Sequence, residues 1–268
     1  MDICTFWLGN KLRTVDRLCL SSMIYAGHRV RLYSYSPVEN LPYGVEQCDA
    51  SEILPFSYIY KLDPYYPGYK SAVTIVQFSD IFRVMLMKAQ KGVWFDTDVY
   101  LVRPFEVDKK QVWLARESVE RVGVSILYFP PDNPIIKDFE DYLLQKDNIP
   151  NWLGFKRRVL KRLLVRLKRQ PLTPNRIGIT VFGNDGISRL AKKHGFFETA
   201  HPKESFYYWM GRKAGRIFDP AYGYMPLDHP DFIGFHIHYK GPTEQKPLTG
   251  SFYEWMVKRL PDFHDYDS

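Results

Sequence analysis

The stretch Gly92-Val93-Trp94-Phe95-Asp96-Thr97-Asp98-Val99 joins a short apolar run to two carboxylates that are one residue apart. We expect the apolar run to form a strand, and ligands of open α/β sheets bind at the carboxyl edge of their strands. Oxygen ligands suit a hard divalent cation such as Mg²⁺ or Mn²⁺. An Asp-x-Asp pair alone is also a common acidic turn, so the flanking sequence has to separate a metal site from a turn.

The segment before this stretch predicts a mostly buried helix. Ser79 is a good N-cap residue, the residues from Ile81 to Ala89 are largely apolar, and Gly92 follows at a position that stops helices. Asp80 and Arg83 are three residues apart and share one face of this helix. They form either a local ion pair or part of a site.

Together these segments resemble a known family. The pattern Ser-Asp-x-x-Arg, then Gly-x-Trp-Phe-Asp-x-Asp, then an apolar stretch ending in Pro-Phe spans Phe78 to Phe105. It resembles the core of the DXD-containing retaining glycosyltransferases of the family 32 type, with distant similarity to family 8 and to the clostridial glucosylating toxins. The resemblance implies an α/β, GT-A fold: a Rossmann-like, mostly parallel central sheet flanked by helices, as one domain over residues 1–268.

The same resemblance implies an activity and residue roles. A hexose-type sugar would pass from a nucleotide sugar, a UDP-sugar in first place, to a glycan or lipid-linked acceptor, with retention and with Mn²⁺ or Mg²⁺. Asp80 would bind donor hydroxyls and Arg83 the transferred sugar. Asp98 would be a direct metal ligand, and Asp96 would serve the donor hydroxyls and the water on the metal.

The N-terminal segment predicts the start of a parallel sheet. Ile3 to Leu8 reads as a strand, Thr14 to Gly27 as a helix, and Val30 to Tyr35 as a second strand, which implies a right-handed parallel unit. In the resembled fold the first strand and its loop hold the nucleotide base. Thr5, Phe6 and Trp7 are therefore candidate donor-binding residues, although a buried first strand alone explains Phe6.

Two later segments carry further candidates. In Phe235-His236-Ile237-His238-Tyr239-Lys240-Gly241, the pattern is similar to a C-terminal His-x-x-Gly loop of family 8 enzymes, in which the His binds the metal. His238 matches best and His236 is the alternative, while Lys240 or Lys246 would neutralise the diphosphate. A histidine in a strand is also often an ordinary core residue.

Asn184 and Asp185 lie in a segment that matches the family only loosely. They are candidates to approach the anomeric carbon, or they cap a helix.

Residues 155–170 form the most basic segment of the chain. Eight of these sixteen residues are Lys or Arg and none is acidic, while Val159, Leu160, Leu163, Leu164 and Leu167 fall on one helical stripe. Such a basic amphipathic helix is typical of membrane-surface binding. A helix packed on the domain with a solvated basic face is the alternative.

Composition sets the remaining limits. The chain has 268 residues, 45% hydrophobic and 25% charged, with net charge +7, which is ordinary globular composition. Its three cysteines have neither zinc-site nor disulfide-framework spacing. With no apolar run of membrane-spanning length and no signal-peptide pattern, we expect a cytoplasmic protein at the inner face of the membrane, in surface polysaccharide or lipopolysaccharide assembly.

Two other function classes stay open. A Mg²⁺-dependent nucleotidyltransferase or phosphohydrolase would use the same carboxylates, but the chain lacks a Gly-x-x-x-x-Gly-Lys-Ser/Thr phosphate loop. A non-catalytic basic module for membrane or nucleic acid explains residues 155–170 but leaves Asp80, Arg83, Asp96 and Asp98 without a role. We therefore expect no nucleic-acid partner.

Overall fold

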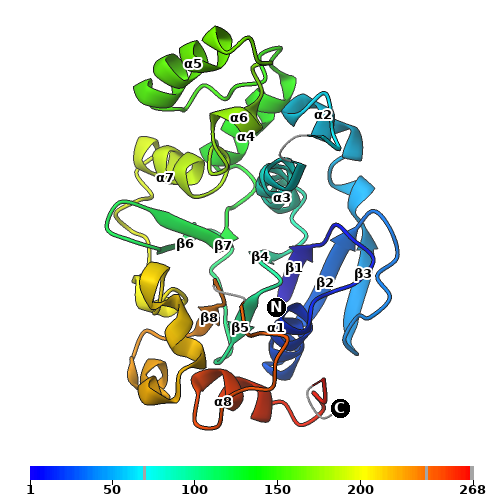
Figure 1. Ribbon diagram of the computed structural model, residues 1–268, viewed down its shortest axis with the longest axis vertical. Helices are drawn as coiled ribbons and strands as arrows, with labels where there is room; N and C mark the ends of the chain where they lie inside the picture. Colours follow the sequence, from blue (N-terminus) through cyan, green and yellow to red (C-terminus); the bar gives the residue numbers. More distant parts are fainter. Residues whose placement is uncertain (69–70, 239–240, 266–268) are drawn as a thin grey trace.

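The structure is a computed structural model that describes residues 1–68, 71–238 and 241–265. Strands and helices are interspersed along the first half of the chain, and the helices lie on both sides of a central sheet (Figure 1). The strands are β1 (Asp2–Phe6), β2 (Arg29–Ser34), β3 (Val45–Asp49), β4 (Val93–Phe95), β5 (Val99–Leu101), β6 (Trp113–Arg116), β7 (Val122–Tyr128) and β8 (Gly234–His236). The helices are α1 (Thr14–Tyr25), α2 (Ile59–Leu62), α3 (Ser71–Lys88), α4 (Pro134–Leu144), α5 (Arg162–Leu167), α6 (Pro174–Ile177), α7 (Asn184–Lys193) and α8 (Phe252–Lys258).

The central sheet has the strand order β3-β2-β1-β4-β7-β6. The first four strands in this order are parallel, whereas β7 runs antiparallel to both β4 and β6. The predicted α/β class, with a mostly parallel sheet flanked by helices, is confirmed. Because β1 and β4 are parallel neighbours, their carboxyl ends meet at one edge, where Asp96 follows β4.

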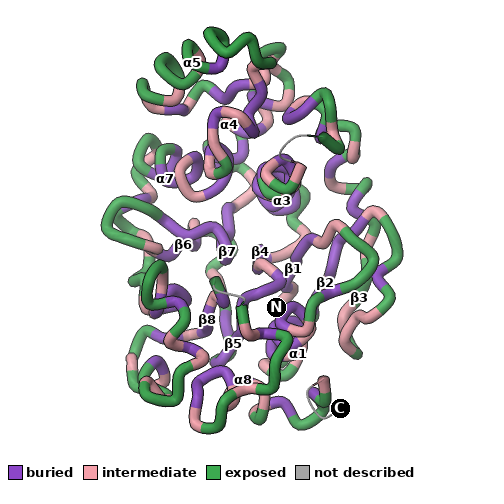
Figure 2. Tube along the Cα trace, viewed as in Figure 1, coloured by how far each residue is buried: buried purple, intermediate pink, exposed green. Residues whose placement is uncertain are grey.

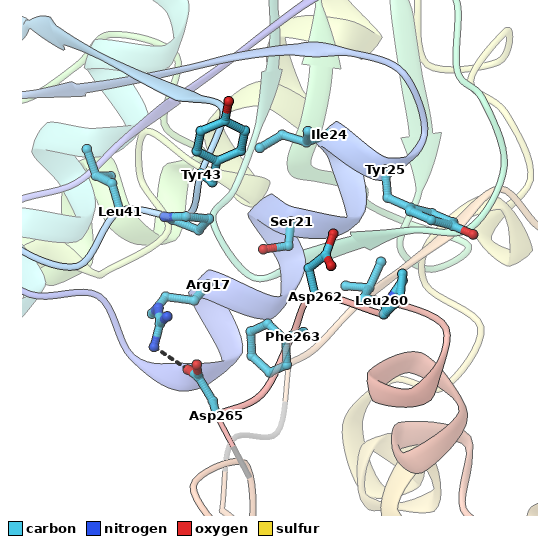
Figure 3. Close-up of a pocket in the computed structure, with 12 residues that line it drawn as sticks. Arg17, Ser21, Ile24, Tyr25, Leu41, Tyr43, Leu260, Asp262, Phe263 and Asp265 are labelled. Atoms are coloured by element: carbon cyan, nitrogen blue, oxygen red, sulfur yellow. Dashed lines mark hydrogen bonds and ion pairs between the residues drawn. The ribbon is translucent and has the colours of Figure 1, made fainter. Parts of the chain in front are cut away.

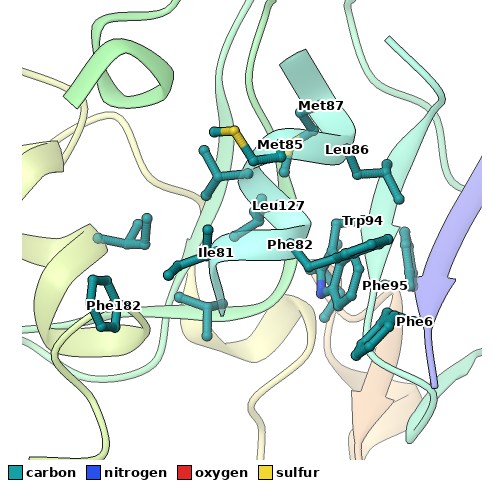
Figure 4. Packing of buried hydrophobic residues seen from close by; sticks show 14 of the residues in the cluster. Phe6, Ile81, Phe82, Met85, Leu86, Met87, Trp94, Phe95, Leu127 and Phe182 are labelled. Atoms are coloured by element: carbon teal, nitrogen blue, oxygen red, sulfur yellow. The ribbon is translucent and has the colours of Figure 1, made fainter. Parts of the chain in front are cut away.

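Helix α3 packs on the sheet beside β1 and β4 through aromatic side chains. The rings of Phe6 and Phe82 stack with centroids 4.5 Å apart, and both lie close to Trp94 in the core (Figure 4). Burying an aromatic or aliphatic side chain of this size stabilises the fold by roughly 1.5–3 kcal/mol. This packing fixes α3 against the strand ends that carry the acidic turn.

The sequence-based start of this helix was wrong. In the described chain the helix begins at Ser71, not at Ser79, because Thr74, Gln77 and Phe78 are already buried on its inner face. Ser79 is therefore an interior residue, and Asp80 and Arg83 lie in the middle of α3. At the other end, Gly92 has φ 155°, and a Cβ there would lie 2.6 Å from the Asp2 carbonyl oxygen. Glycine thus lets the chain enter β4 directly beside β1.

A second, two-stranded sheet joins the acidic turn to the C-terminal part of the chain. Strand β5 pairs antiparallel with β8, and Val99 lies opposite His236. A separate buried aromatic cluster, which includes Tyr100, Trp209 and Phe235, packs beneath this sheet. The pairing brings residues more than 130 positions apart in the sequence to the same end of the central sheet.

The basic segment is helical, as predicted. It consists of a π-helical turn, Lys156–Lys161, that continues directly into α5. It lies at the far end of the molecule from α8, and most of it is exposed (Figure 2). Among the described residues, no helix combines the length and the apolar character that a membrane span requires.

Candidate functional site

The two carboxylates of the Asp-x-Asp pair lie in the tight connection between β4 and β5. The Asp96 backbone N–H donates to Ser125 O at 2.7 Å, and the Val99 N–H donates to Asp96 O at 3.1 Å. Between the carboxylates, the Thr97 hydroxyl donates to Asp16 Oδ1 of α1 at 2.7 Å. Strand, turn and helix therefore fix the direction of both acidic side chains.

The structure brings Asp96, Asp98 and His236 together. One ligand atom of each residue lies within 4.8 Å of the other two, and His236 Nε2 is 3.4 Å from Asp98 Oδ1. The Ile237 N–H donates to the Asp98 carbonyl at 2.9 Å, which ties β8 to the acidic turn. Two carboxylates and one imidazole form a donor set that fits Mn²⁺ or a similar divalent ion.

Arg83 connects this group to α3. Its guanidinium is 3.1 Å from Asp80 Oδ1 and 3.3 Å from Asp96 Oδ1, it donates to Val124 O, and it lies 4.8 Å from the Trp94 ring centroid. The Trp94 indole N–H donates to Asp96 Oδ1 at 2.8 Å. The Asp96 carboxylate is thus held by an indole N–H and by the Arg83 guanidinium.

Asp80 is a buried carboxyl in contact with two helices. Burial raises its pKa to about 7, and the neighbouring Arg83 opposes this rise. Gly183, which precedes α7, lies so close that a Cβ there would be 2.6 Å from Asp80 Oδ2. The N-terminus of α7 therefore abuts the carboxyl, and its backbone dipole favours the ionised form.

A cleft of about 480 Å³ opens beside these residues. Its lining combines aromatic and aliphatic side chains with two arginines and two carboxylates. The buried Trp7 indole nitrogen in this cleft has no hydrogen-bond partner among the described residues. The full lining is Phe6, Trp7, Leu8, Arg13, Ile75, Val76, Ser79, Arg83, Trp94, Asp96, Thr97 and Asp98.

Arg13 is a cleft residue that the sequence analysis missed. Its guanidinium donates two hydrogen bonds to the Asp16 carboxylate, of 2.6 and 2.7 Å, and lies 5.4 Å from the Trp7 ring centroid. The available signal was the Arg13–Asp16 spacing at the start of a helix, which reads as a local capping pair. Asp16 also holds Thr97, so one buried carboxylate orients both the cation and the acidic turn.

The other predicted donor-binding residues differ in their placement. Phe6 and Trp7 line the cleft, while Thr5 is buried in β1 and is not among the lining residues. Lys246 is exposed in the loop after β8 and does not line the cleft either. Lys240 lies outside the described residues.

His238, the preferred ligand from the sequence, is exposed and lines a separate hollow with Glu117 and Val119. Its ring centroid is 6.0 Å from that of His236. The three-residue group contains His236, the alternative from the sequence, because β8 places that side chain beside Asp98. The assignment of the metal ligand to His236 or His238 stays a prediction.

Asn184 and Asp185 occupy the first turn of α7. The Asn184 amide donates to Glu117 Oε2 at 2.7 Å, and Asp185 pairs with Arg157 at 2.9 Å and Arg189 at 3.2 Å. Neither lines the cleft, and Gly183 is the N-cap residue in place of either. Their predicted approach to the anomeric carbon has no support in these contacts.

A different hollow, of about 420 Å³, lies between α1, residues 41–43 and residues 260–265 (Figure 3). Arg17 and Asp265 form an ion pair at its rim. Its lining includes Tyr25, Tyr43 and Phe263 but none of the three metal-binding candidates. The cleft beside the acidic turn is therefore the candidate functional site.

Comparison with known proteins gives limited information. No protein-family model and no curated protein matches the chain. Among solved structures, the chain is similar to one described as "PaToxG Glycosyltransferase", with 15% sequence identity, a TM-score of 0.38, and coverage of 74% of this chain and 79% of that chain. This likeness is too distant to carry an argument about the site, and the resemblance to family 32 stays a prediction.

Proposed function

We propose that this chain is a metal-dependent retaining glycosyltransferase that moves a hexose-type sugar from a nucleotide sugar, a UDP-sugar in first place, to a glycan or lipid-linked saccharide. The observation that carries the proposal is the grouping of Asp96, Asp98 and His236 beside a cleft whose lining also includes aromatic side chains and the cations Arg13 and Arg83. Hard oxygen ligands with an imidazole suit Mn²⁺, and a donor diphosphate would complete its coordination.

Each part of the cleft has a role in this reaction. Asp98 and His236 would hold Mn²⁺ or Mg²⁺, which acts as a Lewis acid on the diphosphate leaving group when bound. Asp96, fixed by Trp94 and Arg83, would accept hydrogen bonds from donor hydroxyls and from water on the metal.

The aromatic wall suits the nucleoside part of the donor. Trp7 offers a flat ring and an indole N–H that has no partner among the described residues, and a uracil carbonyl would accept from it. Arg13, held by Asp16, would lie over the diphosphate and stabilise its negative charge as the glycosidic bond breaks.

The carboxylates also bear on stereochemistry. Asp96 and Asp98 are the carboxylates in the described lining of the cleft, and both are assigned to the metal and the donor. We therefore propose a same-face attack, in which an oxygen of the departing phosphate accepts the proton of the acceptor hydroxyl.

The acceptor class that we propose is a saccharide in surface polysaccharide or lipopolysaccharide assembly.

Hydrolysis of a donor panel tests the proposal. We expect purified protein with Mn²⁺ to release UDP and free sugar slowly from at least one UDP-sugar, because water substitutes for the missing acceptor. Asp98→Asn should lower this rate at least about 100-fold, while Asp132→Asn, at an exposed site outside the cleft lining, should not change it. Release of UMP and sugar phosphate would instead favour a phosphohydrolase, and the absence of any metal-dependent turnover or binding would contradict the enzyme.

A further inference from the structure

The basic helical segment turns its apolar side chains outward. Phe155 is 72% exposed, Leu167 70%, and Leu163 and Leu164 53% each. Soluble proteins rarely leave such large apolar side chains together on one face without a binding purpose. We call this set the leucine face, and it consists of Phe155, Val159, Leu160, Leu163, Leu164 and Leu167.

Polar contacts and the buried Val165, not the leucine face, attach the segment to the rest of the protein. Arg157 donates to Asp185 at 2.9 Å and to Thr180 Oγ1 at 3.1 Å, Arg162 donates to Asp147 at 3.0 Å, and Val165 is buried. An ordinary surface helix does the reverse and buries its apolar stripe. In this segment the body of the protein leaves roughly half of the apolar stripe in solvent, whereas the packed-helix alternative expects that stripe to be covered.

The segment that carries the leucine face is also strongly positive. Six exposed cations of the segment have no ion-pair partner among the described residues, and residues 155–170 contain no acidic side chain. The segment therefore combines exposed apolar side chains with an unneutralised positive charge. These cations are Lys156, Arg158, Lys161, Arg166, Lys168 and Arg169.

We propose that the leucine face docks on an anionic lipid bilayer, with the six cations on the headgroups and the apolar side chains at the acyl boundary. An anionic bilayer offers negative headgroups for the cations and an apolar phase for the leucines. Nucleic acid would match the charge but offers no apolar phase for the leucines. A second copy of the chain would cover the leucines but would bring two sets of cations together.

The segment is also joined to the cleft. Arg157 binds Asp185 in the first turn of α7, and the residue before α7, Gly183, abuts Asp80. Docking would therefore set the distance between the bilayer and the cleft, which suits a lipid-linked acceptor; this last step alone rests on the proposed function.

Flotation with lipid vesicles tests the docking without any enzyme assay. We expect the full chain to float with phosphatidylcholine vesicles that contain phosphatidylglycerol, and to bind pure phosphatidylcholine vesicles much more weakly. The double variant Leu163→Glu/Leu167→Glu should weaken binding to the anionic vesicles at least about tenfold, because two apolar side chains are lost and two negative charges are added.

Matched controls make the result specific. Val119→Glu/Leu248→Glu adds the same charge at two exposed apolar residues elsewhere, 88% and 62% exposed, and should bind more tightly than the leucine-face variant. Lys156→Gln/Lys161→Gln/Lys168→Gln keeps the leucines and should lose most of the preference for anionic lipid.

The proposal is overturned if the leucine-face variant floats like the wild type, or if Val119→Glu/Leu248→Glu loses as much binding as that variant does. It is also overturned if the wild type does not bind the vesicles. Dimerisation of the wild type through this face, in place of vesicle binding, would make a second copy of the chain the occupant. Donor hydrolysis in the absence of vesicles should be equal in the wild type and the leucine-face variant, so failure of the docking is distinguishable from failure of the proposed activity.

Discussion

The cleft and the leucine face depart from the usual distribution of side chains in opposite directions. Asp80, Arg83 and Asp98 are buried in or next to the cleft, whereas the basic segment exposes Leu163 and Leu167. Charged side chains are seldom buried without partners, and large apolar ones are seldom gathered in solvent. Beside the cleft, Arg83 pairs with Asp80 and Asp96 and donates to the Val124 carbonyl, and the His236 ring lies beside Asp98. The described chain leaves Leu163 53% and Leu167 70% exposed, and the proposed docking surface would cover them.

The comparison yields a first prediction about stability. Arg83→Met removes the cation between Asp80 and Asp96 and leaves buried carboxylates uncompensated, so we expect a loss of roughly 3–5 kcal/mol in the free energy of unfolding. Leu163→Gln removes an apolar side chain that buries little, and should stay within about 0.5 kcal/mol of the wild type. Urea denaturation of both variants checks this. Equal losses would mean that the two regions do not differ in the way described.

The second prediction separates the two histidines. His236→Gln should weaken Mn²⁺ binding about 100-fold, since its ring is 3.4 Å from Asp98. His238→Gln, at an exposed position in another hollow, serves as the matched variant and should change Mn²⁺ affinity much less. Calorimetric titration with Mn²⁺ in the presence of UDP measures both. The reverse order would return the ligand role to His238.

The third prediction concerns orientation of the acidic turn. Asp16→Asn keeps the size of the side chain but weakens its hold on Arg13 and Thr97. We expect about a tenfold loss of Mn²⁺–UDP affinity, the size typical of groups that orient metal ligands. The matched change Asp138→Asn, which affects a carboxylate paired with His194 outside the cleft lining, should leave that affinity in place. An unaltered affinity in Asp16→Asn would show that the turn is rigid without α1.

The smallest expected effect is a pH dependence from Asp80. Burial raises its pKa to about 7, so between about pH 4 and 7 the native state keeps a proton that the unfolded chain releases. The stability that this retained proton gives the native state is present at low pH and is lost as the pH rises through about 7. The amide introduced by Asp80→Asn does not titrate, so the free energy of unfolding of this variant should rise relative to that of the wild type between about pH 5 and pH 8. A constant difference across this range would show that Asp80 stays ionised in the native state.

The sequence predicted those parts of the molecule that depend on short-range patterns. The apolar run before Asp96 and the spacing of Asp80 and Arg83 placed the strand, the acidic turn and the shared helix face. The start of the helix at Ser79 was wrong because the buried pattern continues upstream of a good capping residue. Local preference for a cap is worth about 1 kcal/mol, less than the packing of a further helical stretch.

The sequence did not predict features that depend on pairing between residues far apart in the chain. Whether His236 or His238 faces Asp98 depends on the register of β5 with β8, since these two residues lie on either side of the strand end. The role of Arg13 depends on Asp16 reaching Thr97, 81 residues away. The periodicity of residues 155–170 predicted a helix with two faces. Which face contacts the rest of the protein depends on ion pairs of Arg157 with Asp185 and of Arg162 with Asp147, which periodicity does not predict.

The most direct test of the central claim is an anomalous difference map from crystals grown with Mn²⁺ and UDP. We predict one strong peak within ligand distance of Asp98 and His236, with the diphosphate on its open side and the uracil against Trp7. A peak elsewhere, or UDP bound outside this cleft, would contradict the assignment of the acidic turn as a metal-dependent donor site.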